Sequence, residues 1–310
     1  MKQFNNKYKD KFKQKRIKEL GFYWSVLAIP LIQFCIMYIG VNLNSFILAF
    51  KSYNVGTDGS FTINWVYFDN FKQVFNDIFR SDLFSTMFLN SLTVYAVHLI
   101  AGMTLALFFS YYIYKKFIGV EFFRFMLILP SVISAVAFVL IFKYIADRFF
   151  PQIFGGAGLL TGNPRHSFRI IMAFNLFIGF GTSVLMYSNA MSRIPDSLIE
   201  SAQLEGCSVI REFFEITLPL IYPTLETFLI VGLSNLFIDQ ANLFTFYTNN
   251  ADPQIQTVGY YLFNQVFTER STMSTYPVAS AWGLMMTVIT VPVVFTAKYF
   301  LDKLDKGVEF

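Results

Sequence analysis

The sequence is poor in charge, cysteine and histidine, and each shortage removes a class of protein. Only 14% of the 310 residues are charged, whereas a soluble domain carries about 25%. Two cysteines cannot build a disulfide-rich scaffold, and the two histidines lack the partner spacing of a metal site. Hydrophobic residues, in contrast, fill 55% of the positions. The composition therefore excludes a soluble globular domain and predicts a protein that crosses a membrane several times.

Sequence motifs of catalysis are missing as well. The chain has no HExxH, GxSxG or CxxC run. Its glycine-rich stretch at 155–158 is neither preceded by a strand nor followed by the Lys-Ser or Lys-Thr of a phosphate-binding loop. We therefore predict no enzyme active site, no bound metal and no cofactor. If ATP drives this protein, a separate polypeptide must bind the nucleotide.

Six apolar runs predict an all-α membrane protein with six transmembrane helices, because each run is near the ~20 residues that a helix needs to cross a bilayer. The first run is too long for a cleaved signal peptide, so we expect it to remain as the first span. The runs cover residues 22–50, 86–114, 125–145, 168–187, 216–237 and 278–300.

Lysine and arginine are concentrated on one predicted side of the membrane. Eight of the 24 lie in the first 20 positions, next to an apolar run, which favours a topology signal over a nucleic-acid site. With six spans both termini share a side, and that side holds 16 of the basic residues against 8 on the other. Because basic residues favour the cytoplasmic side, we expect cytoplasmic termini and no nucleic-acid partner.

One polar stretch, residues 193–219, joins the fourth and fifth apolar runs. Pro195 suits the first turn of a helix, where its missing N–H costs nothing, and Asp196 is favoured there by the helix dipole. Gly206 fits the left-handed position just past a helix end. The stretch therefore predicts a short helix over 195–205. On these grounds alone, a connecting helix lying on the membrane surface is an equally good interpretation.

Small, acidic and aromatic residues fall at fixed spacing within this stretch: Glu200, Ser201, Ala202, Glu205, Gly206, Phe213 and Pro219. The pattern resembles the EAA loop of ABC-importer permeases, whose usual form is Glu-Ala-Ala, two residues and Asp-Gly-Ala, followed by a Phe and a Leu-Pro. Ser201, Glu205 and Cys207 depart from that form by small or charge-conserving changes. The runs Phe68-Asp-Asn-Phe, Phe123-Arg and Ile216-Thr-Leu-Pro are similar to patterns of the carbohydrate-type permeases, the maltose-permease class.

The resemblance implies a type I ABC importer permease fold, in which the seven residues above serve coupling to an ATP-hydrolysing subunit. It also implies a second homologous permease, usually forming a heterodimer, a dimer of ATP-binding subunits and an extracellular solute-binding protein. Such an assembly moves a sugar or oligosaccharide across the plasma membrane of a prokaryote by alternating access.

The chain then divides into four parts. Residues 1–21 form a basic cytoplasmic arm, and residues 22–85 hold the first transmembrane helix and an extracellular segment. Residues 86–302 form the permease core of five transmembrane helices with the coupling loop at 193–219. Residues 303–310 form a cytoplasmic tail. The lipid bilayer surrounds the spans.

Polar residues inside the apolar runs are candidates for a substrate path, because polar groups at membrane depth usually face a bundle interior or a water-filled route. Asn175, Gly179 and Thr182 are spaced four and three apart and share one helical face. The alternative is helix-to-helix hydrogen bonding. The candidates are Asn175, Gly179, Thr182, Ser183, Ser234, Asn235, Asp239, Gln240, Ser131 and Ser134.

Other transporters remain alternatives. A permease for an amino acid or a phosphate ester would share the coupling loop, but a cluster of Arg or Lys inside the spans would favour anions, and only Lys143 lies near a span end. A secondary transporter driven by ions would not need a coupling helix, and the inverted repeats it favours are not visible in the sequence.

Overall fold

The computed structural model describes residues 2–55, 61–267 and 274–304, and these residues are mostly helical. One feature departs from the all-α expectation. Strand β1 (Lys51–Val55) pairs antiparallel with β2 (Phe61–Trp65), with Lys51 opposite Trp65. The turn expected at Asp58-Gly59 lies outside the described residues. β2 contains Thr62 and Ile63, which are β-branched and favour extended backbone.

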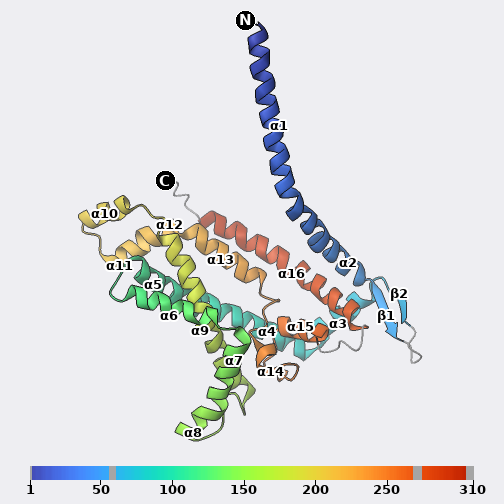
Figure 1. Cartoon of the computed structure of the whole chain (residues 1–310). Helices are drawn as coiled ribbons and strands as arrows, with labels where there is room; N and C mark the ends of the chain where they lie inside the picture. The colour runs from blue at the N-terminus through green and yellow to red at the C-terminus, as the bar shows by residue number, and fades with distance from the viewer. Residues whose placement is uncertain (1, 56–60, 268–273, 305–310) are drawn as a thin grey trace.

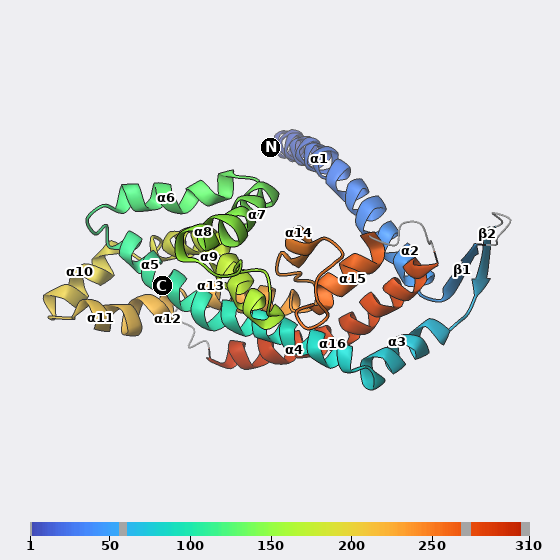
Figure 2. The same ribbon diagram turned by 90° about the horizontal axis from the view of Figure 1, so that it is seen from below.

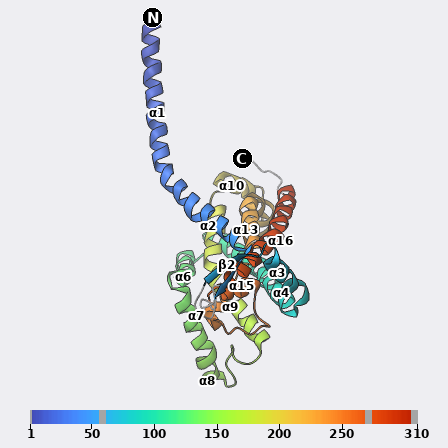
Figure 3. The ribbon, with the colours of Figure 1, turned by 90° about the vertical axis from the view of Figure 1, so that its right-hand side faces the viewer.

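The N-terminal part is a long helical rod that projects from the body (Figure 1, Figure 3). Helix α1 (Lys2–Gln33) continues through a π-helical stretch, η1 (Phe34–Gly40), into α2 (Val41–Leu48). The basic arm and the first span are therefore one continuous element. The most apolar window of this rod is 0% buried within the chain, so lipid or another polypeptide must cover it.

Within the described residues, four helices are continuous and apolar enough to cross a membrane: Arg16–Leu48, Asp82–Tyr114, Pro164–Met191 and Thr275–Leu304. The second consists of α4 (Asp82–Val97), η2 (His98–Gly102) and α5 (Met103–Tyr114), and the last two are α9 (Pro164–Met191) and α16 (Thr275–Leu304). Capping explains two of the starts. Ser81 accepts a hydrogen bond from the Leu83 N–H at 3.2 Å, and Asn163 accepts one from the Arg165 N–H at 3.0 Å.

The third and fifth predicted spans each correspond to a pair of helices, and both pairs are bent by more than 40°. Helix α6 (Val120–Val132) is followed by extended backbone at Ile133 and Ser134 before α7 (Ala135–Tyr144). The other pair, Val209–Leu220 and Tyr222–Ser234, bends by 66° around Ile221, where Pro219 and Pro223 remove helical N–H donors. Counted as single spans, the bent pairs bring the total for the described residues from four to six.

The shorter elements complete the chain, and their bounds are as follows. Helix α3 (Asp69–Arg80) follows the hairpin. After α7 come η3 (Ile145–Phe149) and α8 (Phe150–Phe154), and after α9 comes α10 (Asp196–Leu204). The bent pair comprises α11 (Val209–Glu212), η4 (Phe213–Thr217), α12 (Leu218–Leu220) and α13 (Tyr222–Ser234). Then follow α14 (Leu243–Tyr247) and α15 (Val258–Phe267).

The two ends of the body differ. The N-terminal end of α1, the C-terminal end of α16 and helix α10 lie toward the top of Figure 1, whereas α14 and α8 lie toward the bottom and the hairpin lies at the right-hand edge. Seen from below, α10 and the hairpin mark opposite extremes of the molecule (Figure 2). Helix α10, which belongs to the polar stretch, thus lies on the same side of the body as the N-terminal end of α1 and the C-terminal end of α16.

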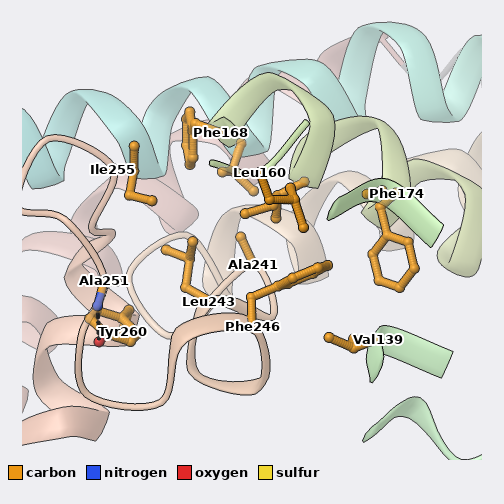
Figure 4. Packing of buried hydrophobic residues seen from close by; sticks show 13 residues of the cluster. Val139, Leu160, Phe168, Phe174, Ala241, Leu243, Phe246, Ala251, Ile255 and Tyr260 are labelled. Carbon is orange, nitrogen blue, oxygen red and sulfur yellow. Dashed lines mark hydrogen bonds between the residues drawn. The ribbon is translucent and has the colours of Figure 1, made fainter. Parts of the chain in front are cut away.

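A largely irregular loop, residues 235–257, follows α13 and is packed into the bundle. Its centre forms a hydrophobic cluster in which Leu243 and Phe246 meet Phe168 and Phe174 of α9 (Figure 4). Buried irregular backbone needs partners for its polar groups. Asn90 of α4 supplies two of them, since its Nδ2 donates to the carbonyls of Gln254 and Gln256, both at 2.9 Å.

Tyr260 and Lys143 brace the same loop from other elements. The Tyr260 hydroxyl donates to the Thr248 carbonyl at 2.9 Å and accepts from the Ala251 N–H at 3.2 Å. Burial raises the pKa of the Tyr260 phenol, so it stays a neutral donor. The Lys143 Nζ donates to the Phe246 carbonyl at 2.9 Å. The loop is therefore fixed to α4, α7 and α15 together.

Candidate functional site

Helix α10 is built much as its sequence indicates. It begins after Pro195, whose backbone is extended (ψ 130°), and ends at Leu204. Gly206 has φ +78°, which confirms the left-handed position expected of it. The Gly206 N–H donates to the Gln203 carbonyl and the Cys207 N–H to the Ala202 carbonyl, both at 3.0 Å. These two bonds are the Schellman arrangement that closes a helix end with a left-handed residue.

One face of α10 packs on the body and the other is open. Ile199 is buried against the cluster that also contains Ile194 and Met191. Glu200, Ser201 and Glu205 are exposed. The Ser201 hydroxyl donates to the Ser197 carbonyl of its own helix at 2.8 Å, and Ala202 is half-buried. The open face is therefore mainly acidic and polar.

Leu204 was not among the expected coupling residues. This residue is 89% exposed at the end of α10, where the helix projects from the body (Figure 1). An apolar residue directly before the Glu-Gly pair was the available signal in the sequence. Leu204 therefore adds one apolar side chain to the open, otherwise acidic and polar face of α10.

Two of the expected coupling residues lie away from this open face. Phe213 is buried, with its ring 4.9 Å from that of Tyr111 and 5.6 Å from that of Phe108, both on α5. Pro219 is exposed in α12, next to the bend at Ile221. Phe213 therefore fixes the polar stretch to the bundle, and it cannot be reached from outside.

The structure separates the expected substrate-path residues into several environments. Gly179 and Ser183 line a cavity of about 180 Å³ between α4, α9 and α13. Ser234 lines a larger groove of about 880 Å³ between α2, α13, α15 and α16. The exposed members are Gly179, Thr182, Ser234, Asn235, Asp239 and Ser134, and Ser183 and Gln240 are half-buried. Ser131 lies in α6, and its side chain is outside the described part of the structure.

The larger groove is also lined by hydroxyl residues that were not among the predicted substrate-path residues. Ser280, Thr287 and Thr290 of α16 line it together with Ser234. Their spacing of seven and three places them on one helical face, and this spacing within the sixth apolar run was the signal available. The groove thus carries a row of hydroxyl groups.

Asn175 differs from the other path candidates because both ends of its amide are engaged. Its Nδ2 donates to the Ala241 carbonyl at 2.8 Å, and its Oδ1 accepts from the Asn242 Nδ2. Ala241 and Asn242 both have positive φ, 49° and 56°, a conformation that costs a residue with a side chain free energy. The contacts favour a packing role, in which Asn175 holds the 235–257 loop in place.

We therefore expect Asn175→Ala to lower the apparent melting temperature of the purified protein. Removing the amide leaves a buried carbonyl and a side-chain amide without partners, at about 1–3 kcal/mol per unsatisfied group. The measurement is thermal unfolding in detergent, followed by tryptophan fluorescence. Asn189→Ala, which changes an exposed asparagine on the same helix, is the matched control. An unchanged melting temperature for Asn175→Ala alongside an unchanged control would contradict the packing role.

The described residues contain no group of three His, Cys, Asp or Glu side chains that could hold a metal ion. The Nδ1 of His98 lies 3.0 Å from the Val94 carbonyl of its own helix. Cys35 and Cys207 are both free thiols. The site thus consists of a protruding helix with an exposed acidic and polar face, and of two hollows between apolar helices that are lined mainly by apolar groups and carry several hydroxyls.

Comparison with known proteins gives the family. Residues 98–310 match the family described as the binding-protein-dependent transport system inner membrane component. The match covers more than half of the chain, and the chain belongs to this family.

Individual relatives extend the similarity to most of the chain. It is 30% identical over 241 residues to the sn-glycerol-3-phosphate transport system permease protein UgpA of Shigella dysenteriae, covering 76% of this chain and 80% of UgpA. It is 27% identical over 184 residues to the maltose/maltodextrin transport system permease protein MalF of Klebsiella aerogenes, covering 56% of this chain and 35% of MalF.

The fold has a close solved counterpart. A chain in the crystal structure of a bacterial alginate ABC transporter, in complex with an alginate pentasaccharide-bound periplasmic protein, superposes with a TM-score of 0.73 at 20% sequence identity. The superposition covers 94% of this chain and 98% of the other. This confirms the ABC permease fold.

Proposed function

We propose that this chain is one permease subunit of an ABC importer that moves a sugar or oligosaccharide into a prokaryotic cell. The observation that carries the proposal is helix α10, a rigid, capped helix with an open face of Glu200, Ser201, Leu204 and Glu205 on a protein of this family. ATP is bound and hydrolysed by a dimer of separate subunits that holds this face. A second, homologous permease completes the path, and an extracellular binding protein delivers the solute.

The mechanism follows from where α10 sits. Helix α10 projects from the body at the end opposite the hairpin (Figure 2). A subunit that binds α10 can therefore move this helix without entering the membrane. Closure of the ATP-binding dimer moves α10 and, with it, the helices to which the polar stretch is fixed. The two permease bodies then change from an inward-open to an outward-open arrangement. Binding of ATP thereby favours one of two states.

The polar groups of the path indicate a neutral solute. Among the side chains of the exposed candidates are three hydroxyls, one amide (Asn235) and one carboxylate (Asp239), and none is a lysine or arginine. The Asp239 Oδ1 accepts from the Ala241 N–H at 2.8 Å. A phosphate ester favours cationic partners, whereas a sugar exchanges its water hydrogen bonds for hydroxyls and amides. The match to UgpA makes a phosphate ester the alternative solute.

Uptake by cells distinguishes these solutes. Cells lacking the gene for this chain, with and without the chain restored, are given radiolabelled maltodextrins, other neutral oligosaccharides or sn-glycerol 3-phosphate. We expect restoration of the chain to restore uptake of a neutral sugar, with no competition from excess sn-glycerol 3-phosphate. Uptake of the phosphate ester alone would contradict the sugar assignment while leaving the permease assignment in place.

We also propose that α10 and both termini face the cytoplasm, as the distribution of basic residues indicates. A chain with Cys35→Ser keeps Cys207 as its single thiol beside α10. In intact cells, a membrane-impermeant maleimide is expected to leave Cys207 unlabelled and to label it once the membrane is permeabilised. A second chain, with Cys35→Ser, Cys207→Ser and Asn163→Cys, reports the opposite side and is expected to label in intact cells. The reverse pattern would overturn this topology.

A further inference from the structure

A buried ion pair fixes the polar stretch to the second span. The Lys115 Nζ lies 2.7 Å from the Glu212 Oε1 and 2.8 Å from Oε2, so it donates to both carboxylate oxygens. The Glu212 side chain is 1% exposed and that of Lys115 is 14% exposed. The Tyr111 hydroxyl lies 3.1 Å from the Glu212 Oε1 and 3.0 Å from the Val209 carbonyl. Together these groups join the end of α5 to α11, whose last residue is Glu212.

Burial of this pair is not explained by stability. Removing two charges from water is costly, and apolar side chains of similar volume often replace a buried ion pair without loss of stability. What the pair provides is a buried contact that is costly to break, because the Glu212 carboxylate receives the Lys115 ammonium on both oxygens and the Tyr111 hydroxyl on one. Separating the partners would leave a charge buried without compensation. The charges also suit the helix ends, with Lys115 at the C-terminus of α5 and Glu212 in the first turn of α11.

The direct chain connection from α10 to α13 is interrupted. The segments Val209–Leu220 and Tyr222–Ser234 meet at a 66° bend, and the residues 213–217 before it form a π-helical stretch. The chain between α10 and α13 is therefore not one straight helix. A displacement of α10 that is passed along this connection alone has to change direction at Ile221.

The contact through Lys115 and Glu212 avoids this bend. Helix α5, which ends beside Lys115, runs along α9, and the buried Ser110 hydroxyl of α5 donates to the Val184 carbonyl of α9 at 2.8 Å. Helix α9 carries Gly179, Thr182 and Ser183 of the candidate path. A continuous series of contacts therefore leads from the polar stretch through α5 to α9 and its candidate substrate-path residues, and it does not include the bend at Ile221.

We propose that Lys115 and Glu212 are positioning residues that transmit the movement of α10 to α5 and α9. This inference rests on the proposed function, since it assigns a role within ATP-driven coupling. The ion pair is the connection between α11 and α5, and Tyr111 and Phe213 pack around it. In a chain without this ion pair, α10 still binds the ATP-binding subunit, but the movement of α10 no longer reaches the candidate substrate path.

The test uses the whole assembled transporter in proteoliposomes. A reporter, Thr182→Cys, is placed in a chain carrying Cys35→Ser and Cys207→Ser. Its rate of labelling by an impermeant maleimide is measured without nucleotide and after trapping with ATP and orthovanadate. The Lys115–Glu212 ion pair is removed by combining Lys115→Met with Glu212→Leu. The matched control combines Arg211→Met with Glu215→Leu, an ion pair of the same segment at 2.7 Å with side chains 67% and 58% exposed.

We expect trapping to change the labelling rate in the reporter chain and in the control. In the Lys115–Glu212 variant we expect the labelling rate to stay unchanged, although this variant still binds the ATPase and hydrolyses ATP. An unchanged melting temperature shows that the variant is folded. If that variant fails to assemble, Glu212→Gln, which keeps the side-chain shape, is expected to reduce the trapping response. A full trapping response in either variant would contradict the proposal that the Lys115–Glu212 pair transmits the movement. Loss of the response in the control would contradict it as well. Absence of any ATPase or trapping response with the unsubstituted pair contradicts the proposed function instead.

Discussion

Replacing Gly181 by alanine is expected to prevent the bundle from forming in its present packing. A Cβ at this position would lie 2.0 Å from the Leu127 carbonyl oxygen and 3.0 Å from its carbon. These are backbone atoms of α6, so no side chain can move aside, and the two helices must separate along their contact. Overpacking typically costs about 1–3 kcal/mol, and an overlap with backbone belongs at or above the top of that range.

Gly179→Ala is the matched control for this prediction, because a Cβ there would meet nothing within 4 Å. The two substitutions lie two residues apart on the same helix and add the same methyl group. The measurement is the yield of monodisperse protein in detergent and its apparent melting temperature. We expect a large loss for Gly181→Ala and almost none for Gly179→Ala. Equal behaviour of the two variants would show that α6 does not pack on α9 through this close contact.

Replacing Gly206 by valine is expected to leave the chain in the membrane and to detach the ATP-binding subunit. The backbone at Gly206 has φ +78°, a conformation that costs a residue with a side chain about 1–2 kcal/mol. Relief of this strain breaks the two hydrogen bonds that close α10 and frays the end that carries Leu204. The measurement is the amount of ATP-binding subunit that co-purifies with a tagged chain.

The substitution Gly206→Asn separates backbone conformation from side-chain bulk. Asparagine adopts the left-handed region more readily than other residues with a side chain, and nothing lies within 4 Å of a Cβ at this position. We therefore expect the Gly206→Asn variant to retain most of the ATP-binding subunit that the Gly206→Val variant loses. Equal loss in both variants would contradict a conformational role for this glycine and indicate direct contact instead.

The local structure of α10 could be predicted from sequence because its signals are local. Pro195, Asp196 and Gly206 each act within one helical turn, and the helix was expected at 195–205 where the structure has Asp196–Leu204. The helical character of the apolar runs could likewise be predicted, since length and hydrophobicity alone decide it. The bend at Ile221 was missed, although Pro219 and Pro223 flank it in the sequence.

Contacts between distant segments could not be predicted. Helical spacing placed Asn175 with Gly179 and Thr182, but what Asn175 touches depends on the 235–257 loop, which is 66 positions away at Ala241. The pairing of Lys115 with Glu212 spans 97 positions, and no local pattern in the sequence connects the two residues. A single sequence carries no record of such pairings.

The central claim is that ATP hydrolysed on a separate subunit, held at α10, drives a solute through this chain. It is tested most directly in proteoliposomes that contain the complex purified through a tag on this chain and that enclose ATP beside α10. The sugar identified by cellular uptake is supplied with its binding protein on the other side. We predict uptake with ATP, none with a non-hydrolysable analogue, and none with Leu204→Glu, which places a charge on the exposed tip of α10. Uptake driven by an ion gradient without ATP, or full ATP-driven uptake by Leu204→Glu, would contradict the claim.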